Sequence, residues 1–159
     1  MGRQLFFAFA VAAFATLAGC GTIRNTVSDG ADANLILRGN DPVAYFTEGK
    51  PVPGNAAIKA EYDGATYRFA SAANREVFLK NPAHYAPAYA GFCSAGAPYA
   101  LKAAIGANVF TIYRDRLYLF GSERSKRGWL LDRDKNIELG DRYWEEETKN
   151  VPWTLATLA

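Results

Sequence analysis

Side chains that bind soft metals are scarce in this 159-residue chain, which has two cysteines, one histidine and one methionine. Because the methionine is Met1, a Met-rich copper site is excluded. The chain also has little excess charge, since 18 basic and 16 acidic residues give a formal net charge of +2. We expect no nucleic-acid partner, because such proteins need a concentrated basic surface.

Sequence motifs of common enzyme classes are absent as well. The chain has no glycine-rich phosphate loop, no Gly-x-Ser-x-Gly nucleophile elbow and no His-Glu-x-x-His pair. We therefore expect a protein that is not an enzyme.

The N-terminal segment has the three parts of a secretory signal peptide. Arg3 gives it a positive start, an apolar run from Leu5 to Ala18 follows, and small residues precede Cys20. The apolar run of about 14 residues is shorter than the ~20 of a transmembrane helix. The residues 17–20, Leu-Ala-Gly-Cys, resemble the bacterial lipobox. The resemblance implies cleavage before Cys20 and lipidation of that cysteine, with acyl chains such as palmitate.

These features predict an exported protein in three parts. We expect a signal peptide at 1–19, a lipidated flexible tether at 20–34 and a globular domain with a C-terminal helical extension at 35–159. Its partner would be a membrane, reached through the lipid anchor on the periplasmic face; no protein partner can be named. The absence of Asp at position 21 favours the outer membrane. Lipid on Cys20 would leave Cys93 as the single free thiol.

Local patterns predict an α+β fold built from small antiparallel hairpins packed with helices. Asp63-Gly64 between two alternating segments is the strongest short-range hairpin signal, and Ser71 is suited to cap a helix that reaches Lys80. The predicted strands are 58–62, 65–69, 109–113 and 117–120, and the predicted helices are 71–80, 99–104, 122–131 and a last one from about 135 or 141.

The two hairpin–helix segments align with each other when one is shifted by 51 residues, which places Tyr62 on Tyr113. One interpretation is a pair of ββα units that share one core. The alternative is that any two hairpin–helix segments attract aromatic residues at similar positions. The other aligned pairs are Tyr67 and Tyr118, Phe69 and Phe120, Ser71 and Ser122, Arg75 and Lys126, Phe78 and Trp129, and Leu79 and Leu130.

Three segments, 41–46 (DPVAYF), 60–71 (AEYDGATYRFAS) and 78–85 (FLKNPAHY), resemble the YHS domain family over about residues 40–93. Residues 91–93 and 116–120 resemble its longer, exported branch. Members often occur near metal transport systems, and related metal-sensing domains bind ions through cysteines. The metal-binding relatives have cysteines where this chain has Ala44, Ala70 and Asn74, so their metal site does not carry over.

His84 and Cys93 are the candidate site residues, since they lie nine residues apart across a Pro-containing turn. They could bind copper or zinc together with a carboxylate such as Asp41, or form a nucleophile and its base. The alternative is a half-exposed histidine and an inert buried thiol. Four aromatic residues near Cys93 either line a groove or pack in the core: Tyr85, Tyr89, Phe92 and Tyr99.

The sequence thus favours a lipid-anchored cell-envelope protein of the YHS type. Its expected function is a non-enzymatic binding module for a metal or a small ligand, centred on His84 and Cys93. The alternative is an envelope structural or interaction protein that has no ligand.

Overall fold

The computed structural model describes residues 22–149; the expected signal peptide (1–19), Cys20 and residues 150–159 lie outside the described part. Within residues 22–149, no helix has the length and apolar character to cross a membrane. The elements, in chain order, are η1 (Ile36–Gly39), α1 (Ala44–Thr47), β1 (Asn55–Tyr62), β2 (Ala65–Phe69), α2 (Ala72–Lys80), α3 (Pro82–Tyr85), η2 (Ala88–Gly91), η3 (Ala97–Tyr99), β3 (Val109–Tyr113), β4 (Arg116–Phe120), α4 (Glu123–Leu130), α5 (Arg133–Tyr143) and η4 (Trp144–Thr148).

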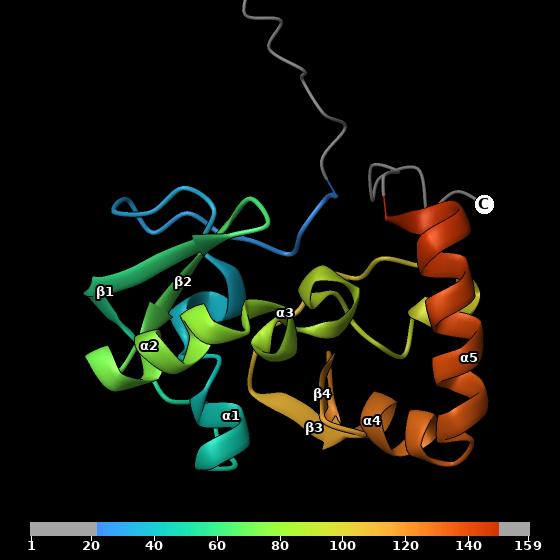
Figure 1. Ribbon diagram of the computed structural model, residues 1–159. Coiled ribbons are helices and arrows are strands. Elements are labelled where there is room, and N and C mark those ends of the chain that lie inside the picture. Colours follow the sequence, from blue (N-terminus) through green and yellow to red (C-terminus); the bar gives the residue numbers. More distant parts are fainter. Residues whose placement is uncertain (1–21, 150–159) are drawn as a thin grey trace, which may run out of the picture.

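The predicted α+β class is confirmed, because two antiparallel hairpins are each followed by a helix (Figure 1). β1 pairs with β2, and β3 pairs with β4. Asp63 and Gly64 have φ angles of 49° and 73°, as a type I′ turn requires. Arg114 and Asp115 adopt the same left-handed conformation without a glycine, with φ angles of 46° and 61°. The second turn is therefore the more strained of the two.

The two units have the same internal geometry. The Tyr67 and Phe78 rings lie 4.7 Å apart, and the aligned Tyr118 and Trp129 rings lie 5.0 Å apart. The strand register repeats as well, since Tyr62 pairs with Ala65 and Tyr113 pairs with Arg116. The second aromatic pair of each unit follows the same pattern: Phe69 to Phe78 at 5.1 Å, and Phe120 to Trp129 at 5.3 Å. The ββα geometry therefore repeats in three dimensions.

Each unit's helix begins at a serine cap, as predicted. The Ser71 hydroxyl accepts a hydrogen bond from the Asn74 N–H at 3.1 Å, and the Ser122 hydroxyl accepts one from the Ser125 N–H at 3.1 Å. These bonds satisfy backbone donors that the first helical turn leaves unpaired. The predicted helix at 99–104 is wrong: the chain makes only the short turn η3, because Ala100 has a left-handed φ of 55°.

The interior consists of two clusters, with β4 between them, in place of the single core that we expected. Side chains alternate along a strand, so Leu117 and Leu119 face one cluster while Tyr118 and Phe120 face the other. The first cluster joins these leucines to the aromatic residues of the first unit, Tyr67, Phe69 and Phe78. The second cluster surrounds Trp129. The first cluster thus holds the two units together.

The segment at 22–34, which we expected to be a flexible tether, packs on the first hairpin. Val27 and Leu35 exchange backbone hydrogen bonds of 3.0 and 2.9 Å. The Thr66 N–H donates to the Asn34 carbonyl at 2.8 Å, which places residues 34–35 alongside β2. The Asn25 N–H also donates to the Ala90 carbonyl at 2.9 Å. The prediction of a tether is therefore wrong for residues 22–34.

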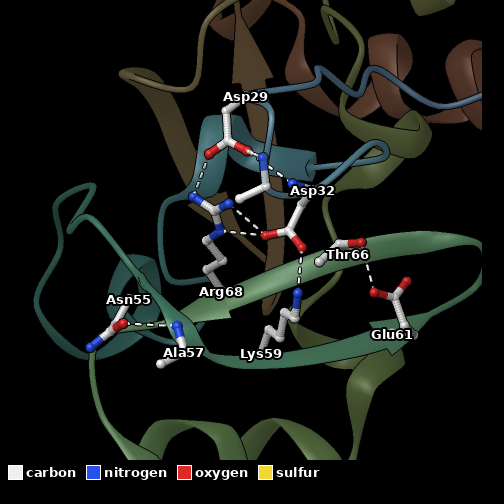
Figure 2. A network of polar contacts seen from close by, with 9 residues as sticks. Asp29, Asp32, Asn55, Ala57, Lys59, Glu61, Thr66 and Arg68 are labelled. Carbon is white, nitrogen blue, oxygen red and sulfur yellow. Dashed lines mark hydrogen bonds and ion pairs between the residues drawn. The ribbon is translucent and has the colours of Figure 1, made fainter.

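Ion pairs fix the same segment to the hairpin (Figure 2). The Arg68 guanidinium contacts Asp29 at 2.6 Å through Nη1 and Asp32 at 2.5 Å through Nη2. Lys59 Nζ contacts the other Asp32 oxygen at 2.6 Å. Asp32 is buried. The tether was predicted because the segment has few large apolar side chains. The segment is attached to the hairpin by charged groups instead.

Removing the aromatic ring at the centre of either unit tests the repeat. Phe78→Ala and Trp129→Ala should each lower the free energy of unfolding by about 3–5 kcal/mol, because each leaves a cavity beneath its hairpin. The half-exposed neighbours Val77 and Leu130 (both 38% exposed) supply matched controls, since their alanine variants should cost far less. Urea unfolding measures all four variants. If the Trp129→Ala protein is as stable as the Leu130→Ala protein, Trp129 does not stabilise the second unit as proposed.

The Arg68 cluster predicts acid sensitivity. Arg68 holds the pKa of Asp29 at about 2, and Lys59 together with Arg68 lowers the pKa of Asp32. A carboxylate with a lowered folded-state pKa stabilises the fold above its unfolded pKa, near 3.8, and this stabilisation is lost as the pH falls towards 2. Asp29→Asn should therefore be less stable at pH 7 and lose less stability between about pH 4 and pH 2.

Urea midpoints measured across this pH range test the prediction. The exposed Glu76→Gln variant serves as the control and should follow the wild-type profile. An Asp29→Asn profile that coincides with the wild type would show that the Arg68 contact adds nothing to stability.

Candidate functional site

Asp41 contacts Ala70 and Asn74, two of the three positions at which the resemblance implies cysteines in metal-binding relatives. Its carboxylate is fully buried, and the sequence Asp41-Pro42-Val43 folds back so that Oδ1 accepts the Val43 N–H at 2.9 Å. Oδ2 accepts the Ala70 N–H at 2.8 Å and the Asn74 Nδ2–H at 2.7 Å. One carboxylate thus links the start of α1, the end of β2 and the first turn of α2.

This arrangement does not fit a soft metal ion. Both Asp41 oxygens face N–H donors, and a cation needs lone pairs instead. Two of the three expected thiol positions, Ala70 and Asn74, supply those donors. Across residues 22–149, no group of three or more His, Cys, Asp or Glu side chains gathers where a metal could be held.

The structure separates most of the site residues predicted from the sequence. Cys93 is buried in the first cluster, and its backbone N–H bonds to the Ala103 carbonyl at 3.1 Å. Phe92 is buried against Trp144, and Tyr85 packs on Phe46. Tyr99 is 71% exposed. Two of the predicted residues remain together, because His84 and Tyr89 both line one cavity of the described chain.

That cavity is an open groove of about 530 Å³ between the turns of the two hairpins. Its walls come from both ends of the described chain and from both units, so residues far apart in the sequence form it. The lining comprises Thr22, Arg24, Ile36, Tyr62, Asp63, Tyr67, Ala83, His84, Ala86, Pro87, Ala88, Tyr89, Ala90, Arg114, Asp115, Arg116, Trp144, Glu145 and Lys149.

His84 links the first unit to the turn of the second. The short helix α3, which begins at Pro82, presents it beside Phe46 and Tyr85, with ring separations of 4.9 and 4.4 Å. Its Nδ1 lies 3.3 Å from Asp115 Oδ2. Because the imidazole is held by two rings and one carboxylate, it has a fixed position at the groove wall.

The other charged side chains of the groove occur in ion pairs. Arg24 contacts Asp63 at 2.5 Å, and Lys149 contacts Glu145. Arg116 contacts Asp141 at 2.8 Å, and its guanidinium lies 5.2 Å from the centre of the Tyr89 ring. The groove therefore presents both signs of charge beside aromatic surfaces, which suits a small polar ligand more than a bare ion.

Tyr89 lies between the groove and α5. It is 2% exposed, and burial raises the pKa of its hydroxyl. A Cβ atom on Gly140 would lie 2.7 Å from the Tyr89 hydroxyl oxygen, so only glycine fits there. Sequence reasoning overlooked Gly140, although an isolated glycine inside a helix often marks close packing.

Lys102 is a second residue that the sequence did not single out. It is 1% exposed, and burial lowers the pKa of its ammonium group. Its Nζ donates to the Lys149 carbonyl at 3.2 Å and lies 5.2 Å from the Trp144 ring centre and 5.7 Å from that of Phe92. It thereby fastens the end of η4, which carries part of the groove wall. No local sequence signal predicts this contact.

The Asp41 contacts predict how much stability is lost when this carboxylate is replaced. Asp41→Asn replaces one accepting oxygen by an NH₂ group that faces other donors, so it should lower the free energy of unfolding by about 1–3 kcal/mol. Asn74→Ala removes a single donor at a half-buried position and should cost less. Urea unfolding compares the two variants, and an Asp41→Asn protein as stable as the wild type contradicts this account.

A family model for the YHS domain matches residues 43–89. The matched span covers α1, the first hairpin, α2, α3 and His84, whereas the second unit lies beyond it. No curated protein and no solved structure matches the chain. The match agrees with the resemblance carried by segments 41–46, 60–71 and 78–85. Residues 43–89 are therefore similar to the YHS domain.

Proposed function

We propose that this protein is a lipid-anchored, non-enzymatic binding module of the bacterial cell envelope, and that the groove between its two hairpin turns is the ligand site. The observation that carries the proposal is the composition of the groove wall. The first unit supplies Asp63 and His84 to it, and the second supplies Asp115 and Arg116.

The size of the groove supports a small molecule. Its volume of about 530 Å³ falls within the usual range of ligand pockets, about 300–1,000 Å³. Aromatic faces from Tyr62 and Trp144 stand beside paired cations and carboxylates. A ligand with a flat portion and hydrogen-bonding groups of both kinds would match these walls.

A small molecule is a better proposal than a metal ion for this groove. The sequence suggested that His84 and Cys93 form a pair of ligands, but Cys93 does not line the groove that His84 lines. His84 has one carboxylate neighbour, Asp115. A transition-metal site would need further ligands.

An interaction role without a ligand has one observation in its favour. Tyr99 is 71% exposed and Leu131 is 89% exposed. Tyr99 lines a hollow of about 340 Å³ together with Gly128 and Asp132, and Asp132 directly follows Leu131 in the sequence. Exposed apolar groups of this kind mark protein contacts in many proteins.

Native mass spectrometry of the protein purified from membranes in mild detergent tests the ligand proposal. The expected spectrum contains a bound small molecule. His84→Ala should lower its occupancy about tenfold, which corresponds to a loss of about 1.4 kcal/mol. Lys80→Ala, at an exposed helix end outside the groove, supplies the control and should retain it.

Separate equilibrium dialysis with Zn(II) and Cu(I) tests the metal alternative. Metal retention that His84→Ala abolishes would contradict the proposal of a small molecule. Bare polypeptide in the spectra, with no metal retained, would favour the interaction role.

A further inference from the structure

The two ends of the described chain meet at the groove. The Ile23 N–H donates to the Lys149 carbonyl at 3.1 Å, and Thr22 and Lys149 both line the groove. The Lys102 ammonium donates to the same carbonyl at 3.2 Å. Figure 1 shows the start of the described chain and the end of the last helix on one side of the molecule, with α1 on the opposite side.

The chain is held firmly from its first described residues onward. Asn25 Nδ2 donates to the Gly91 carbonyl at 2.8 Å and to the Ile105 carbonyl at 3.1 Å. Together with the Arg68 ion pairs to Asp29 and Asp32, these bonds fix the whole span from Ile23 to Leu35. No free tether of about 14 residues remains between Cys20 and the folded domain.

The length of chain between Cys20 and the fold is therefore very short. Two residues, Gly21 and Thr22, separate Cys20 from Ile23, and the three residue steps from Cys20 to Ile23 span at most about 10 Å when extended. A domain of about 130 residues has a radius of gyration near 14 Å, so its far side lies more than 30 Å away. A linker this short cannot bring the far side of the domain to the membrane surface in which Cys20 would be anchored.

We propose that the rim of the groove, formed by Thr22, Arg24 and Lys149, faces a lipid bilayer and lies directly against its headgroups. The proposal rests on the lipid anchor at Cys20, which is part of the proposed function. It adds a fixed orientation: the groove opens at the membrane surface, and α1 points away. A ligand would then enter from the lipid–water interface.

The anchor, and not surface charge, sets this orientation. The cations at the rim are paired, Arg24 with Asp63 and Lys149 with Glu145. The exposed acidic run 145–147 lies on the same side. Anionic lipids therefore offer no net attraction to this face, so the orientation should be the same on neutral and anionic membranes.

Fluorescence quenching on vesicles tests the orientation. The full chain is expressed in a lipidating bacterium, and its acyl groups are verified by mass. A fluorophore is attached through Glu145→Cys at the groove rim or through Glu48→Cys at the end of α1; both glutamates are surface partners of a lysine. The vesicles contain phosphatidylcholine with a nitroxide on the headgroup, with or without phosphatidylglycerol.

The label at position 145 should be quenched at least about twofold more than the label at position 48, because the two sides of a domain this size lie more than about 30 Å apart. Inserting twelve Gly-Ser residues between Gly21 and Thr22 extends the reach to about 50 Å and should abolish the difference. Both results should be independent of phosphatidylglycerol.

Equal quenching of the two labels in the acylated protein overturns the proposed orientation and leaves the anchor intact. A quenching difference that survives the Gly-Ser insertion also overturns the proposed orientation, because the short linker would then not be the cause of the difference. Protein without acyl groups overturns the proposed anchoring, and this orientation with it.

Discussion

The architecture depends on the contact of one guanidinium with two carboxylates. Arg68 projects from β2 and binds Asp29 and Asp32, and this contact fixes the N-terminal segment along the first hairpin. Because that segment is fixed, the chain enters the fold beside Lys149, at the edge of the groove. Backbone hydrogen bonds of Ile23, Asn25 and Val27 hold the same segment, so the ion pairs and these bonds together place residues 22–34 at the groove wall.

The duplicated ββα geometry explains why a groove exists at all. Each unit closes its own hairpin with an aromatic residue of its helix, Phe78 in the first and Trp129 in the second. The units then join through Leu117 and Leu119, on the face of β4 that the second unit does not use for its own cluster. The turns of the two hairpins both line one groove. At its wall, His84 of the first unit contacts Asp115 in the turn of the second. A position that holds thiols in metal-binding relatives is closed here by Asp41 and its N–H donors.

Local signals made much of the fold predictable. Asp63-Gly64 predicted the turn of the first hairpin, and Ser71 and Ser122 predicted the two helix starts, because turns and caps depend on neighbouring residues. The site was harder, since its walls join residues as distant as Arg24 and Lys149, and no local pattern encodes such contacts. His84 and Tyr89 were identified as candidates, whereas Cys93 belongs to the core. The tether prediction failed because ion pairs, which composition does not reveal, hold that segment.

Hydrogen exchange of the full chain tests most directly whether the N-terminal segment belongs to the fold. The backbone amides of Asn25, Val27 and Leu35 donate to carbonyls at 2.9–3.0 Å, so they should exchange slowly, at rates close to those of β1 and β2. The contradicting result is exchange of these three amides at the rate of an unfolded peptide while β1 and β2 stay protected. That result would restore a long tether and remove the constraint on which the groove and its orientation depend.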